Sequence, residues 1–304
     1  MPSSQTSYVD HAVSPGTIYE YQILRQDGFV NFYGDGSGYI CAGIEIPPEE
    51  NRGTLILCVA TDVIVPLSNE LARLERDMAG DGWTVIRHPS PVADWGAPGW
   101  FSAVTNLRNA IKGYYFADTN NVKAVLLFGN VAAPLSGKQQ VDGHEESKRA
   151  WPADGYYAYI YGDWTDSSLT ATNYSVWEYV VDHWEERLYP LPARQQNIPG
   201  DGKFDQDAPP TNLVLQLGRV NLARLGFPDS EVELLRRYLN KEHAWRTAAV
   251  TVPRRGIVSD SYGVNGGYEP FAAGGWRAAA TLLGPANIDV GSYGTWNAVV
   301  TSNA

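Results

Sequence analysis

The stretch Gly53–Ala60, which reads GTLILCVA, decides the fold of this 304-residue chain. From Leu55 onward every residue in the stretch is apolar, so polar and apolar positions do not alternate. A short, uninterrupted apolar run is typical of a strand that is covered on both faces of a parallel sheet. We therefore expect this segment to be a buried strand of an α/β domain.

The residues downstream alternate between helical and strand patterns. Apolar side chains recur at helical spacing over residues 67–78, beginning near a Ser68 cap, and again over residues 100–115. Strand patterns occupy residues 83–88 (WTVIRH) and 121–131 (NVKAVLLFGNV). The order strand–helix–strand–helix–strand predicts parallel pairing with right-handed crossovers.

Two regions flank this core or interrupt it. Residues 1–50 contain alternating patterns such as GTIYEYQIL (residues 16–24), which predict antiparallel strands, and the proline-rich stretch PPEENRG then closes the segment. The α/β domain is expected over residues 51–304, with a long, ordered, irregular insertion at about 135–210.

Helices and strands return after the insertion. A strand is predicted over residues 213–222 and a helix over 227–246, where Ser230 and Glu233 have the spacing of a capping box. The segment RRGIVSD (254–260) predicts a further strand, GGWRAAATLLG a short helix, and the final residues, GTWNAVVTSNA, the start of another helix.

Four segments together resemble gingipain-type cysteine peptidases, which are relatives of the caspases. They are VKAVLLFGNV (122–131), ADGYYAYIYGDW (153–164), LQLGRVNL (215–222) and SEVELLRRYLNKEHAWR (230–246). The resemblance covers roughly residues 53–260 and implies a caspase-like, three-layer α/β sandwich with a parallel sheet. The front end, SYVDHAVSPGTIYEYQI, also looks like the last strands of a fibronectin-type-III or immunoglobulin-like module.

The chemistry of that family requires a histidine after one central strand and a cysteine after the next, so that a thiolate can attack a carbonyl carbon. The family's Gly-His-Gly turn is absent here, and no cysteine follows Cys58. His144 lies in a loop of suitable character but precedes the region where the pair should lie. No catalytic residue is therefore carried over. We expect a non-catalytic portion, or an inactive relative, of a cysteine peptidase.

The two cysteines, Cys41 and Cys58, lie in strand-like apolar runs. Such a setting predicts two buried thiols that act as small apolar side chains, with a disulfide as the alternative. A catalytic thiol needs a more exposed and electropositive position.

Acidic residues in two loops are candidate calcium ligands. In WPADGYYAYIYGDWTD (151–166) the tyrosines are expected on an extended strand, with acidic residues at its ends: Asp154, Asp163 and Asp166. In NIPGDGKFDQD (197–207) Pro199 and Ala208 exclude an EF-hand, which leaves an irregular loop lined by Asp201 and Asp205. The resemblance to gingipains, which bind structural calcium, favours the metal; ordinary acidic turns are the alternative.

Charge and composition limit the partners. The net charge is −11 without a cluster of Lys and Arg, which argues against nucleic acid and anionic membranes, and no apolar run is long enough to span a bilayer. The start lacks a secretory pattern, so the chain is either cytoplasmic or a mature form or excised piece of a longer protein. The acidic excess with many Tyr, Trp, Gly and Asn residues favours a bacterial protein at the cell surface or outside the cell.

Two other functions remain open. One is a calcium-stabilised extracellular module for binding, adhesion or surface assembly, which would pair with other chains or with its own copies through an exposed β edge. The other is carbohydrate processing, with Asp163 and Glu185 as the acid and base and several of the ten tryptophans stacking on sugars.

Overall fold

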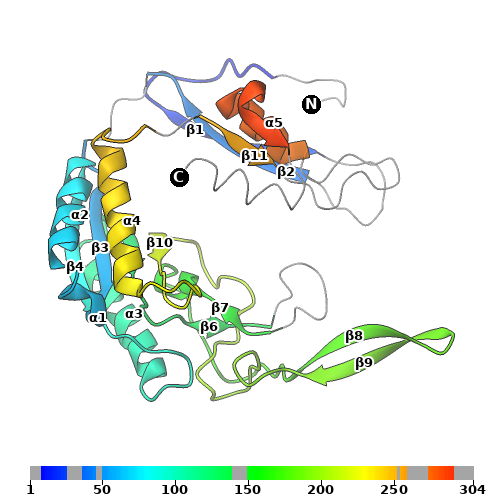
Figure 1. Cartoon of the computed structure of the whole chain (residues 1–304). Helices are drawn as coiled ribbons and strands as arrows, with labels where there is room; N and C mark the ends of the chain where they lie inside the picture. The colour runs from blue at the N-terminus through cyan, green and yellow to red at the C-terminus, as the bar shows by residue number, and fades with distance from the viewer. Residues whose placement is uncertain are drawn as a thin grey trace. The chain divides into compact units, whose positions relative to one another are not determined.

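The computed structural model describes residues 8–25, 36–45, 50–138, 149–251, 254–258 and 273–290 (Figure 1). The chain divides into two compact units, Met1–Leu239 and Asn240–Ala304. Each unit is described by itself.

The first unit is built on a four-stranded sheet in which all strands are parallel. Its strands are β3 (Gly53–Ala60), β4 (Trp83–Ser90), β5 (Val122–Phe128) and β10 (Gln216–Val220), and they lie in the order β10-β5-β3-β4. The predicted α/β class and parallel pairing are confirmed. Strand β3 is central, and every one of its residues after Gly53 is buried, as its uninterrupted apolar run predicts.

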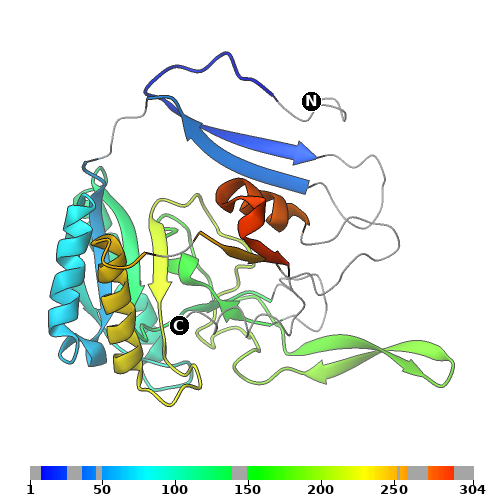
Figure 2. The same ribbon diagram turned by 45° about the horizontal axis from the view of Figure 1, so that its top comes forward.

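Helices cover both faces of this sheet. They are α1 (Thr61–Ile64), α2 (Ser68–Gly80), α3 (Trp100–Ala117) and α4 (Glu231–Arg246). Figure 2 shows α2 and α4 side by side, and Arg236 of α4 bonds Glu70 of α2 at 3.1 Å. The right-handed crossovers β3-α2-β4 and β4-α3-β5 run in opposite directions along the sheet, which places α3 on the other face.

The helix start predicted at Ser230 is confirmed. The backbone N–H of Glu233 donates to the Ser230 hydroxyl oxygen at 3.3 Å, which satisfies one of the free N–H groups at the start of α4. Leu235 and Leu239 form the buried stripe of this helix.

The insertion between β5 and β10 is ordered by short elements. They are β6 (Leu135–Ser136), β7 (Trp151–Pro152), the 3-10 helix η2 (Asp154–Tyr157), β8 (Asn173–Val180) and β9 (His183–Pro190). Strands β6 and β7 pair with each other, and β8 and β9 form an antiparallel hairpin.

The tyrosine-rich stretch is not a strand, so that prediction is wrong. Residues 154–157 form η2, and the carbonyls of this stretch bond a side chain instead of a neighbouring strand. Arg108 of α3, only 9% exposed, donates to the carbonyl oxygens of Tyr156, Tyr159 and Gly162 at 2.9, 3.1 and 2.8 Å. A planar guanidinium can serve several carbonyls at once, which stabilises an irregular chain path.

The N-terminal strands pair as predicted. Strand β1 (Ile18–Arg25) is antiparallel to β2 (Gly36–Gly43). Cys41 of β2 is exposed while Cys58 of β3 is fully buried, and neither forms a disulfide. The prediction of two buried thiols is therefore correct for Cys58 and wrong for Cys41, because the described part of this hairpin leaves Cys41 uncovered.

The second unit begins another parallel pair. Strand β11 (Gly256–Val258) pairs with β12 (Ile288–Val290), and between them lie α5 (Ala273–Leu283) and the 3-10 helix η3 (Pro285–Asn287). Strand β11 and helix α5 were predicted, whereas β12 was not. The predicted terminal helix lies outside the described residues.

Candidate functional site

A ligand site is expected at the carboxyl ends of β3 and β5. In doubly wound sheets ligands bind where crossovers leave neighbouring strands in opposite directions, which here is between these two strands. The chain packs closely at this point. Gly129, with φ of 81°, lies so near β3 that a Cβ on it would be 2.8 Å from the Cβ of Ala60.

An asparagine follows each of the strands β5 and β10. Asn221, after β10, donates from Nδ2 to Oδ1 of Asn130, after β5, at 3.2 Å. Asn130 in turn donates to Asp94 at 3.4 Å, and Arg224 pairs with the same carboxylate. Amides can orient a ligand, but they supply neither a nucleophile nor a base. His144 lies outside the described residues.

Cys58 lies beneath this edge and is fully buried. Burial raises the pKa of its thiol to about 12, although the Ser90 hydroxyl and the Arg219 guanidinium act in the opposite direction. The thiolate, which is the nucleophilic form, is therefore scarce at neutral pH.

Glu231, at the start of α4, and Asp62 of α1 are two neighbouring carboxyl groups that the sequence does not predict to lie together. Burial and the negative charge of Asp62 raise the pKa of Glu231, while the N–H of Leu222 lowers it. One oxygen of Glu231 is buried without a hydrogen-bond partner. The two residues are 169 positions apart in sequence (231 minus 62), so no local pattern could bring them together.

The first candidate calcium ligand, Asp154, forms an ion pair with the guanidinium of Arg219. Its two carboxylate oxygens accept from Nε and Nη2 of Arg219 at 2.6 and 2.8 Å. Arg219 also donates to the carbonyl oxygen of Val131 at 2.7 Å. This ion pair fastens η2 to β10 and positions the insertion.

The structure brings Asp166 and Asp201 to one turn, residues 197–203. Asp166 accepts from the backbone N–H groups of Gly200 and Gly202, both at 2.7 Å. Asp201 pairs with the ammonium of Lys203 at 2.7 Å, and the Lys203 side chain is only 2% exposed.

Asp205 accepts hydrogen bonds from a neighbouring loop, residues 165–169. Asp163 belongs neither to this loop nor to the turn of residues 197–203. Burial raises the pKa of Asp205, but backbone N–H groups of residues 167–169 and the Thr165 hydroxyl donate to it and lower the pKa to about 2. Asp163 is exposed and lies near the guanidinium of Arg108.

Calcium remains a prediction at these positions. Among the described residues no group of three or more His, Cys, Asp or Glu is arranged to hold a metal ion. One hard donor is nevertheless free: Asn197 is fully buried, its Nδ2 donates to the carbonyl oxygens of Gly137 and Phe204, and its Oδ1 has no partner. Asn197 begins the turn that contains Asp201.

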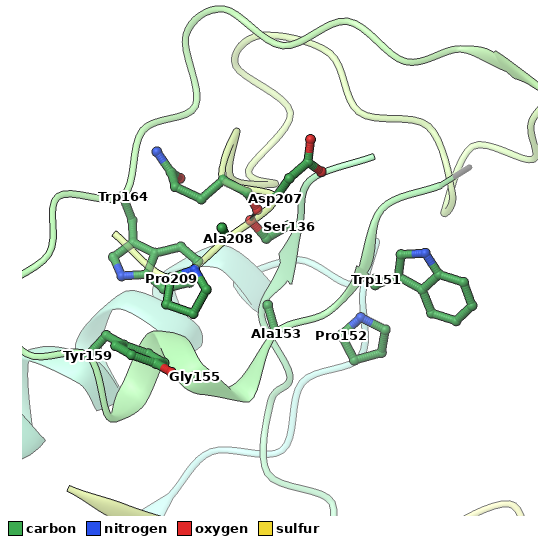
Figure 3. A pocket seen from close by; sticks show the side chains of 11 residues that line it. Ser136, Trp151, Pro152, Ala153, Gly155, Tyr159, Trp164, Asp207, Ala208 and Pro209 are labelled. Atoms are coloured by element: carbon green, nitrogen blue, oxygen red, sulfur yellow. Dashed lines mark hydrogen bonds between the residues drawn. The ribbon is translucent and has the colours of Figure 1, made fainter. Parts of the chain in front are cut away.

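A cavity of about 220 Å³ lies within the insertion (Figure 3). Trp151 and Trp164 lie at opposite ends of it in Figure 3, and the indole N–H of each is buried without a hydrogen-bond partner. The Ser136 hydroxyl on the wall already donates to the carbonyl oxygen of Gln206 at 2.6 Å. The cavity is lined mainly by apolar surface.

The β8–β9 hairpin, residues 173–190, is here called the hairpin arm. It extends from the insertion as an isolated ribbon (Figures 1 and 2), and its two-residue turn has positive φ at Val181 and Asp182. One face, here called the aromatic face, carries apolar side chains that are 59–70% exposed: Trp177, Tyr179, Trp184 and Leu188. Glu186 lies directly across from Trp177 on the same face.

The opposite face of the hairpin arm, here called the polar face, carries the charged side chains that bond one another, beside Tyr174, Val176 and Val180. Tyr189 donates to Glu178 at 2.5 Å, Arg187 pairs with Glu178 at 3.3 Å, and His183 bonds Glu185 at 2.8 Å. Glu185, the residue considered for carbohydrate chemistry, belongs to this network. The sequence pattern does not predict that Trp177 and Trp184 are exposed together.

Comparison of the chain with protein-family models, with characterised proteins and with solved structures finds no match. Within the described ranges no helix has both the length and the apolar character needed to cross a bilayer.

Proposed function

We propose that this chain is a gingipain-like, caspase-related α/β domain that binds other proteins and does not cleave peptides. It serves as a non-catalytic portion, or an inactive relative, of a cysteine peptidase outside the cell or at its surface. Its fold supplies a rigid base for the insertion, and the insertion supplies the surface for recognition.

The observation that carries this proposal is the chemistry at the carboxyl edge of the sheet. The chemistry of the family requires a histidine and a reactive cysteine, and the carboxyl ends of β5 and β10 carry neither: they are followed by Asn130 and Asn221, in contact at 3.2 Å. The thiol of Cys58 is buried on β3 with a pKa of about 12. Neither arrangement generates a thiolate at the surface.

The test combines thiol labelling with peptide hydrolysis. In the folded chain iodoacetamide should alkylate the exposed Cys41 and leave Cys58 unmodified until urea unfolds the protein, as read by peptide mass spectrometry. A panel of fluorogenic peptides should not be cleaved. Alkylation of Cys58 in the folded chain, together with cleavage that is lost in Cys58→Ser but kept in Cys41→Ser, would overturn the proposal.

A second candidate role is that of a calcium-stabilised binding module. The buried, unpartnered Oδ1 of Asn197 favours it, because hard oxygen donors without hydrogen bonds suit calcium and this one shares a turn with Asp201. The ammonium of Lys203 competes for the same carboxylate.

Thermal melts in excess calcium and in excess EDTA separate the two states. If calcium binds this turn, the melting temperature should be higher with calcium than with EDTA, and Asn197→Ala should remove the difference. The exposed Asp182→Asn, in the turn of the hairpin arm, is the control and should keep it. Identical melts in the two buffers reject the calcium role.

A further inference from the structure

The hairpin arm carries an exposed surface that its own fold does not use. A two-stranded hairpin without a third strand or a covering helix is marginally stable in water. Here the polar face is held by its own ion pairs, whereas the aromatic face leaves Trp177, Tyr179 and Trp184 at 59%, 63% and 62% exposure. Exposed apolar patches of this kind mark interaction sites.

The charge on this face identifies the kind of partner. Glu186 makes no hydrogen bond or ion pair with the described residues, and apolar side chains surround it: Trp177 across the ladder, and Trp184 and Leu188 two residues away on β9. A carboxylate beside two indole rings attracts a cation in two ways, through direct charge and through the negative faces of the rings.

The same charge disfavours a second copy of this chain as the partner. Residues 173–190 contain four carboxylates (Glu178, Asp182, Glu185 and Glu186) and one guanidinium (Arg187), which gives 1 − 4 = −3 with histidine neutral. Pairing two aromatic faces would bury both copies of Glu186 in an apolar interface without counter-charges, which is costly.

We propose that the aromatic face binds an extended polypeptide segment that presents an arginine side chain to Glu186. Arginine is favoured over lysine because its planar guanidinium stacks on indole rings and bonds a carboxylate through two N–H groups. The segment lies along the hairpin arm, where no other strand of the described residues pairs with β8 or β9. This inference rests on the proposed function, because it names the partner of a binding domain.

The test uses fluorescent peptides in which threonine alternates with arginine, lysine, serine or glutamate, and anisotropy with the full chain as the readout. The arginine peptide should bind best, the lysine peptide more weakly and the other two not measurably, and added salt should weaken binding. Glu186→Gln and Trp177→Ala should each weaken the arginine peptide about tenfold.

Matched variants keep the result interpretable. Glu185→Gln, on the polar face of the same strand, should leave affinity within about twofold. Glu186→Lys should abolish binding of the arginine peptide and create binding of the glutamate peptide, which an unfolded hairpin arm could not do. Circular dichroism checks that each variant is folded.

Several outcomes would overturn the inference. They are equal binding of all four peptides, no binding of any, or arginine-peptide binding that Glu186→Gln leaves unchanged. Concentration-dependent dimers lost in Trp184→Ala would assign the face to a second copy, and tryptophan-dependent binding of a glucan oligosaccharide would assign it to sugars. Failure of the proposed function is seen separately, as peptide cleavage and Cys58 alkylation.

Discussion

At the scale of single residues, buried ionic side chains determine the path of the insertion. Arg108 binds three carbonyl oxygens of residues 156–162, and its guanidinium carbon also lies 4.6 Å from the centre of the Tyr156 ring. Hydrogen bonds from a charged donor are about twice as strong as neutral ones. A segment whose composition favours a strand is thereby held as a turn and a 3-10 helix.

Arg108→Met should lower the free energy of unfolding by roughly 3 kcal/mol, because it leaves buried carbonyl oxygens without donors. Urea unfolding followed by tryptophan fluorescence measures the loss. Lys112→Met, one turn further along α3, is the control and should stay within about 0.5 kcal/mol of the parent chain. Equal stability of the two variants would mean that the carbonyls are satisfied in another way.

Asp205 should make the stability depend on acid pH. Its pKa is lowered from 3.8 to about 2, so the ionised carboxylate stabilises the fold above about pH 4, and this stabilisation is lost as the pH falls through about 2. Asp205→Asn should be less stable at neutral pH and lose less stability on acidification. Urea titrations across this range test it, and a variant that loses as much stability as the parent contradicts the assigned pKa.

At the scale of elements, close backbone packing fixes the connections of the sheet. Gly129 has a φ of 81°, and a Cβ added to it would lie 3.2 Å from the Cγ2 atom of Val63. Positive φ is strained for residues with a Cβ, and the clash adds to that strain. Both effects act at the turn directly after β5, which lies against Ala60 at the end of β3.

Gly129→Ala should therefore destabilise the chain by roughly 2–4 kcal/mol. Gly96→Ala is the matched control, because Gly96 has the same φ of 81° but open space around it, and it should cost only about 1 kcal/mol. Differential scanning calorimetry of both variants separates the strain of positive φ from the steric clash. Equal shifts in melting temperature would show that the contact with β3 relaxes freely.

The elements that sequence predicts well are those whose pattern is local. The apolar run of β3 and the helical spacing of α2, α3 and α4 are encoded by neighbouring residues, and these elements form where expected. The tyrosine stretch was misassigned because its partner, Arg108, lies about 50 residues upstream. The exposed ring pair of the hairpin arm, Tyr179 and Trp184, was missed because exposure depends on what covers a strand, which periodicity does not report.

At the scale of the whole molecule, the two units differ in how much they bury. The four-stranded sheet and α4 as far as Leu239 enclose one apolar core. In the second unit β11 and β12 have three residues each, and among residues 254–290 none whose burial is described is fully buried. The described residues of this unit that follow α4 form a two-stranded sheet with one helix, and these elements alone bury too little apolar surface to offset the entropy of ordering them.

Residues 50–251, produced alone, should therefore unfold cooperatively with a melting temperature close to that of the first unit in the full chain, because every strand of the four-stranded sheet and the whole of α4 lie within this range. Residues 240–304, produced alone, should lack a cooperative transition, because the described residues around the parallel pair β11–β12 include none that is fully buried. Calorimetry and circular dichroism of the two fragments measure both expectations. A sharp transition in the 240–304 fragment would show that the second unit is a folding domain, and non-cooperative melting of the 50–251 fragment would show that the sheet depends on residues outside that range.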